Sequence, residues 1–260
     1  MPRLIIAALA AVVPGCAAAA PPTPAVIPAE QATPVTPAVP ASGPAVRPRA
    51  QDRPGIAVFP FTNGGSFGRE REDLAALEVG IQGLLLTELQ QNPALRIVER
   101  GVLRQMLEEQ DLATAGRVDA STAARVGRMV GARYAITGTF MDLNGNFRLD
   151  GRIIDVETGE ILRAVRIENQ RRENLYRLLV DMAGQIVSGV QLAPLAVEEQ
   201  RSRRSRDVPD DAVLMLALAM DAEENGRSEQ AVELYRQVVQ RFPDYTEARD
   251  ALRQIEEVEG

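Results

Sequence analysis

Between residues 134 and 167 the sequence contains three strand-forming runs joined by two short turns. The runs cover residues 134–143, 147–156 and 160–167 and are rich in β-branched and aromatic residues. The first turn is Asn144-Gly145-Asn146 and the second is Glu157-Thr158-Gly159, and both sequences are typical of hairpins. We therefore predict a three-stranded antiparallel meander whose first two strands are separated by a turn only.

The sequence before and after this meander alternates strand and helix patterns. Two short apolar runs, GIAVFPF at 55–61 and LRIVE at 95–99, indicate strands. The spacing of apolar residues predicts helices over 73–91, 102–110, 121–130 and 175–191. Helices interleaved with two strands and followed by a meander are typical of an α/β domain with a mixed sheet, and we assign this domain to residues 55–195.

The amino terminus has the features of a secretion signal that ends in a cysteine. An arginine precedes the apolar run Leu4 to Val13, which is too short to span a membrane as a helix. The next residues, VVPGC, resemble a bacterial lipobox, so residues 1–16 are interpreted as a lipoprotein signal peptide and Cys16 as the lipidated residue. The alternative is a degenerate signal with an incidental cysteine. Ala17 after the cysteine favours the periplasmic face of the outer membrane.

Residues 17–54 consist almost entirely of Ala, Pro, Thr and Val. A segment of this composition cannot bury a core, and it predicts a disordered, extended linker. At the rise of a polyproline chain its contour length is about 100 Å. Because Cys16 is the only cysteine, no disulfide can form within the chain.

After the α/β domain we expect an Arg-rich connector over residues 196–210 and a helical segment over residues 211–260. The run RSRRSR at 201–206 fits contact with anionic lipid head groups or a polyanion, although a hydrated linker is the more common interpretation of such a run.

The helical segment resembles one tetratricopeptide (TPR) repeat, which is a helical hairpin, followed by a capping helix. The positions that carry this resemblance are Ala219, Ala231, Tyr235 and Pro243. One repeat alone buries too little surface to fold, so it must pack on the capping helix, on the α/β domain or on a partner. Met215, Leu218 and Tyr235 are candidate partner-binding residues on its concave face, with internal packing as the alternative.

The sequence lacks the residue types on which many catalytic sites depend. It contains no His, and all 29 basic residues are Arg, which excludes imidazole bases, Schiff-base lysines and a P-loop lysine. The net charge of −7 argues against nucleic-acid binding. We expect no enzyme, no cofactor and no metal site, and a hydrolase built on paired carboxylates is the remaining enzymatic alternative.

Four stretches of the α/β region, IAVFPF, LRIVERGVLRQMLEEQ, VGARYAITGTF and IIDVETGEIL, resemble the periplasmic domain of the curli production assembly/transport (CsgG/HfaB-like) lipoprotein family. That domain is itself similar to the amino-terminal domain of the Tol-system β-propeller protein (TolB) and to lipoprotein activators of penicillin-binding proteins. The resemblance covers about half of the chain and implies a CsgG/TolB-N-like α/β fold followed here by the TPR hairpin.

In the secretion channel, the resemblance implies that each subunit lends two long membrane-crossing hairpins to a shared pore, one of them between the strands that match 134–143 and 147–156. The present sequence has room for neither hairpin. We therefore expect a non-enzymatic, outer-membrane-anchored periplasmic lipoprotein that binds secretion or assembly proteins of the envelope and that can form homo-oligomeric rings, as its relatives do. The alternative is an activator of a peptidoglycan synthase, a penicillin-binding protein.

Overall fold

The computed structural model of this 260-residue chain describes residues 53–65, 74–110 and 118–259. These residues lie in one compact unit, Val46–Gly260. The strands are β1 (Gly55–Val58), β2 (Thr62–Asn63), β3 (Arg96–Ile97), β4 (Tyr134–Leu143), β5 (Asn146–Asp155) and β6 (Ile161–Arg171). The helices are α2 (Leu77–Gln90), α3 (Arg100–Glu109), α4 (Ala120–Met129), the 3-10 turn η2 (Arg172–Asn174), α5 (Leu175–Gly189), α6 (Val197–Arg204), α7 (Asp210–Glu224), α8 (Ser228–Arg241) and α9 (Thr246–Glu259).

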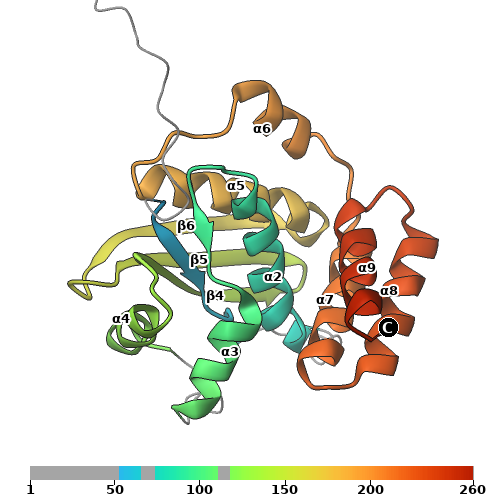
Figure 1. Ribbon diagram of the computed structural model, residues 1–260. Helices are drawn as coiled ribbons and strands as arrows, with labels where there is room; N and C mark the ends of the chain where they lie inside the picture. Colours follow the sequence, from blue (N-terminus) through green and yellow to red (C-terminus); the bar gives the residue numbers. More distant parts are fainter. Residues whose placement is uncertain (1–52, 66–73, 111–117, 260) are drawn as a thin grey trace, which may run out of the picture. The chain divides into compact units, whose positions relative to one another are not determined.

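The strands form one mixed sheet in the order β3-β1-β4-β5-β6, with β2 paired to β4 (Figure 1). β1 runs parallel to both β3 and β4, whereas β4, β5 and β6 form an antiparallel meander. The parallel pairs are those whose strands are connected through helices, as crossover connections require. The predicted α/β fold with a mixed sheet and C-terminal helices is therefore confirmed.

The turn between β4 and β5 consists of two residues, Asn144 and Gly145, because Leu143 pairs directly with Asn146. Both turn residues have positive φ angles, 56° and 85°, as a type I′ hairpin turn requires. The Asp142 carboxylate accepts a hydrogen bond of 2.6 Å from the Gly145 N–H. The two strands are thus joined without an inserted segment, as the Asn-Gly pair predicts.

Helices cover the two faces of the sheet, because successive strand residues point to opposite faces. On one face, Val58, Ile136 and Leu149 pack with α2 and α5. On the other face, Ala135 and Ile154 pack with α3 and α4. Asp119 caps the start of α4 by accepting a hydrogen bond of 2.7 Å from the Thr122 N–H.

Helices α7, α8 and α9 share the first of these cores with α2 and α5 (Figure 1). Of the three packing sites open to the TPR-like segment, the structure thus uses both the capping helix and the α/β domain. Among the described helices, none is both long enough and apolar enough to cross a membrane.

Candidate interaction site

Two glycines of α2 allow α7 to lie unusually close to it. A Cβ atom added at Gly80 would overlap the Ala217 side chain, and one at Gly83 would lie 2.7 Å from the Met220 sulfur. Helix backbones approach this closely only where small residues meet. The contact buries Leu216 and Ala219 in the shared core, so α7 is an integral part of the folded unit.

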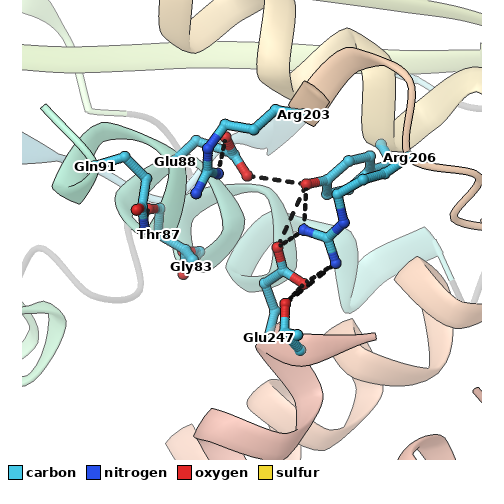
Figure 2. Close-up of polar contacts among 9 residues, drawn as sticks. Gly83, Thr87, Glu88, Gln91, Arg203, Arg206 and Glu247 are labelled. Carbon is cyan, nitrogen blue, oxygen red and sulfur yellow. Dashed lines mark hydrogen bonds and ion pairs between the residues drawn. The ribbon is translucent and has the colours of Figure 1, made fainter. Parts of the chain in front are cut away.

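A cluster of polar side chains reinforces this packing where α2, α5, α6 and α9 meet (Figure 2). We call it the Tyr176 junction, and its members are Glu88, Tyr176, Arg203, Arg206 and Glu247. Arg203 donates to the Glu88 carboxylate over 2.7 Å, and Arg206 donates to the Glu247 carboxylate over 2.8 Å. The Tyr176 hydroxyl lies between the two pairs, donating to Glu88 over 3.2 Å and accepting from Arg206 over 2.8 Å. The junction therefore connects four helices in one hydrogen-bonded network.

Burial sets the electrostatics of this junction. Burial, together with the charges of Glu88 and Glu247, raises the pKa of the Tyr176 hydroxyl, which stays protonated as a donor. Burial would also raise the pKa of Glu247, but the hydrogen bonds and charge of Arg206 outweigh it and hold that pKa below its ordinary value. The Arg206 guanidinium stacks over the Tyr176 ring, 5.1 Å from its centroid. The Arg206–Glu247 pair is therefore ionised at neutral pH, and the Tyr176 hydroxyl beside it is neutral.

A second polar contact connects α3 to the end of α7. Arg100 pairs with Glu223 over 3.0 Å, and the Tyr235 hydroxyl donates to the same carboxylate over 2.7 Å. Arg104 donates to the backbone carbonyl of Glu224 over 2.6 Å. Burial raises the pKa of the Glu224 carboxyl, despite the nearby charges of Arg100 and Arg104. The C-terminal helices are thus fastened to the α/β domain at these two places, and the ion pair of Arg172 with Asp210 over 3.5 Å adds a third.

Two arginines of the run RSRRSR, Arg203 and Arg206, take part in the Tyr176 junction. The sequence predicts a connector over residues 196–210, and part of this segment is helical. Residues 197–204 form α6, and Arg203 and Arg206 are only 17% and 25% exposed. Arg204 pairs with Asp181 of α5 over 2.7 Å. Arg203 and Arg206 therefore serve internal packing, whereas Arg201 and Arg204 stay exposed in their ion pairs.

The predicted partner-binding residues lie in or against the shared core. Cys16 lies outside the described residues. Tyr235 is buried, and Met215 and Leu218 are half-buried against the shared core. Their predicted role in partner binding stays a prediction, and their observed contacts are those of internal packing.

Two surface cavities lie on the two sides of the edge strand β6. The larger, about 750 Å³, lies between β6, α5 and α6, and its lining combines apolar residues such as Ile167 and Val187 with charged ones such as Glu168, Asp181 and Arg203. The smaller, about 660 Å³, lies over the part of the sheet that α3 and α4 leave uncovered, and Thr137, Arg152 and Arg166 line it. Within the described ranges no three acidic, His or Cys side chains are placed to hold a metal ion. Both cavities therefore combine apolar side chains with charged side chains of both signs.

Sequence reasoning missed the Tyr176 junction and the cavities. The glycines at 80 and 83 indicate close contact with another helix. A second signal is that α2 and α7 carry apolar residues on all sides, as is typical of helices buried between layers. The pairing of Arg206 with Glu247 had no sequence signal, since 41 positions separate the two residues.

Comparison with known proteins agrees with the family resemblance. Residues 44–151 match the family model described as the curli production assembly/transport component CsgG. No curated protein matches the chain.

Several solved structures are similar to parts of the chain. The C-terminal domain of LpoB from Salmonella enterica is 20% identical, with 45% of this chain and 83% of that chain covered and a TM-score of 0.32. TolB from Acinetobacter baumannii is 16% identical over 55% of this chain and 29% of that chain, with a TM-score of 0.38. The PelC dodecamer from Paraburkholderia phytofirmans is 14% identical over 54% of this chain and 89% of that chain, with a TM-score of 0.32.

Proposed function

We propose that this chain is a lipid-anchored protein of the bacterial envelope that binds other envelope proteins and catalyses no reaction. The observation that supports this most is the match of residues 44–151 to the CsgG family model. The lipobox-like VVPGC and the long proline-rich linker, read from the sequence, agree with an anchored domain held away from its membrane.

The β4–β5 connection supports an interaction role in place of a transport pore. A membrane-crossing hairpin needs about ten residues in each added strand. The two-residue turn at Asn144 and Gly145 contains no residues for such strands, and β6 continues through η2 directly into α5. The helices α7 to α9 instead extend the surface of the α/β domain, and the polar contacts between the two parts hold this combined surface in one arrangement.

Membrane attachment is tested by the Cys16→Ser variant. The wild-type chain is expected in the outer-membrane fraction, and the variant is expected in the soluble periplasmic fraction or as uncleaved precursor. A variant that still fractionates with the outer membrane would exclude the lipid anchor.

Partner class is tested by crosslinking in intact envelopes followed by affinity purification and mass spectrometry. Recovery of secretion or assembly components supports the proposed role. A second candidate, activation of a peptidoglycan synthase, is favoured by the linker, whose contour of about 100 Å suits reach across the periplasm. Recovery of a synthase, with stimulation of its activity by the purified chain, would select this candidate. Size-limited dye release from liposomes carrying the chain would contradict both.

A further inference from the structure

The strand β6 leaves one long edge of the sheet open. β6 ends the strand order, and among the described residues it pairs with β5 alone. The strand has eleven residues, which is long for an exposed edge. An open edge presents unpaired backbone donors and acceptors to any extended chain that aligns with it.

The register identifies which backbone groups face outward. The Val156 N–H donates to Arg133 on the β4 side, whereas the Asp155 N–H donates to Glu160 on the β6 side. Odd-numbered β5 residues therefore turn their backbone groups toward β6, because neighbouring residues in a strand alternate. Their partners Arg163, Val165 and Ile167 bond to β5. It follows that Ala164 and Arg166 direct their N–H and C=O groups to the open side.

The two cavities flank this edge, one on each face of the sheet. The larger lies beside Ile167 and has apolar residues of α5 in its lining together with Glu168 and Asp181, and the smaller lies beside Ala164. Side chains of an added strand alternate between the two faces. An added strand would thus turn every second side chain toward the α5 side, where Val180 and Val187 offer apolar contact, and the others toward the polar sheet face.

Charge indicates what kind of strand fits. β6 itself contains three arginines and one glutamate, so two such edges repel each other. On the uncovered sheet face, Arg148 and Arg166 both pair with Asp150, while Arg152 is exposed and has no ion pair with any described residue. Arg163, on the other face, is likewise exposed and unpaired within the part of the chain that the structure describes. Acidic side chains that a docking strand turns toward the polar sheet face would find Arg152 available.

We propose that β6 is a docking edge for an extended, acidic segment of a partner protein, which adds to the sheet as a further strand with alternating apolar and acidic residues. The segment 17–54 of the chain itself is a poor occupant, because its many prolines lack the N–H that pairing needs. The inference rests on the proposed protein-binding role and is independent of the lipid anchor.

The test measures binding of a synthetic peptide of alternating valine and glutamate to the full chain by fluorescence anisotropy. Ala164→Pro removes one outward N–H without removing a bond to β5, and Ala164→Thr is the matched control that keeps it. Ala164→Pro is expected to weaken binding about tenfold and Ala164→Thr to leave it unchanged, with circular dichroism confirming that both variants are folded.

Charge and backbone pairing are tested separately. Arg152→Glu should weaken binding, whereas Arg249→Glu, at another exposed arginine without an ion pair among the described residues, should not. A peptide of alternating valine and lysine should bind the wild-type chain poorly, as should a valine/glutamate peptide with methylated backbone nitrogens.

Equal binding to the Pro and Thr variants, or no binding of the acidic peptide, would overturn the proposal. Self-association that Ala164→Pro abolishes would also overturn it, because the occupant of the edge would then be a second copy. If the peptide fails while envelope proteins are still recovered by crosslinking, only the docking edge is excluded and the interaction role stands.

Discussion

At the level of single residues, the Tyr176 junction shows that one arginine can bind several partners in a chain whose basic residues are all Arg. A guanidinium offers several donors in one plane, so a single Arg206 serves Glu247, Tyr176 and Thr246 at once. Such a half-buried cluster is stabilising only while every member keeps its partners, because a buried charge left alone is costly.

We expect Arg206→Ala to destabilise the fold by about 3 kcal/mol, since it leaves the Glu247 carboxylate buried with no cation to bind. Arg204→Ala is the matched control, because Arg204 is 61% exposed in its pair with Asp181, and it should cost no more than about 0.5 kcal/mol. Urea unfolding followed by circular dichroism measures both. Equal losses of unfolding free energy in the two variants would show that the junction stabilises the fold no more than a surface ion pair does.

The lowered pKa of Glu247 predicts a pH dependence of stability. A carboxyl whose pKa is lower in the folded state stabilises the fold above its unfolded pKa, and this contribution disappears as the pH falls through the folded value. The stability gap between the wild type and Glu247→Gln should therefore be largest near neutral pH and shrink in acid. Glu256→Gln, in an exposed pair with Arg236, is the control and should show a small gap throughout. A Glu247→Gln gap that does not change with pH would contradict the assignment.

At the scale of elements, the α2–α7 contact decides where the TPR-like hairpin sits. A conventional repeat uses its small residues to pack its own two helices together. Here Ala217 of α7 meets Gly80 of α2, while α7 also packs on α8. The first helix of the hairpin is therefore buried from two sides, which accounts for its apolar residues all around.

We expect Gly80→Ala to destabilise by about 2 kcal/mol, because the overlap with Ala217 outweighs the better helix propensity of alanine. Gly184→Ala is the control: Gly184 lies inside α5 with open space around it, so the same substitution there should stabilise by about 0.5 to 1 kcal/mol. The double variant Gly80→Ala with Ala217→Gly should recover part of the loss. Chemical denaturation of the three variants checks this. A stabilising Gly80→Ala would show that the helices are not in close contact.

At the scale of the whole molecule, the helices α7 to α9 and the α/β domain share one continuous apolar core. A core of this kind is expected to unfold cooperatively, because neither part keeps its apolar surface covered without the other. Residues 55–195 and 211–260 are thus separate segments along the chain only. In the folded protein they pack around one core.

We predict a single unfolding transition for α2 and α7. Native-state hydrogen exchange with mass spectrometry should show peptides of both helices opening with the same free energy and the same dependence on denaturant. A chain that ends at Asp207 should be unstable or aggregate, because Ile81 and Leu84 belong to the core shared with α7. If α7 peptides exchanged at markedly lower denaturant than α2 peptides, the hairpin would be an independent unit.

Most elements of the α/β domain follow from patterns of neighbouring residues. The alternation of residues 134–167 and the pair Asn144-Gly145 predict the meander, and strand and turn residues act through neighbours a few positions away. Helices α3, α4 and α5 were predicted within a few residues of their observed bounds for the same reason. The strand β6 runs four residues beyond its predicted end, and β3 is reduced to two residues, because strand ends depend on pairing with β5 and β1.

Which distant groups meet depends on the three-dimensional packing of the chain. Arg206 and Glu247 are paired across 41 positions, and α6 is held by Glu88 and Asp181, which no local pattern links to it. The open edge of β6 is likewise a property of strand order. Short-range periodicity specifies the elements because their hydrogen bonds and side-chain directions are local, whereas close packing and charge pairing are settled by the three-dimensional arrangement in which all buried surface is covered at once.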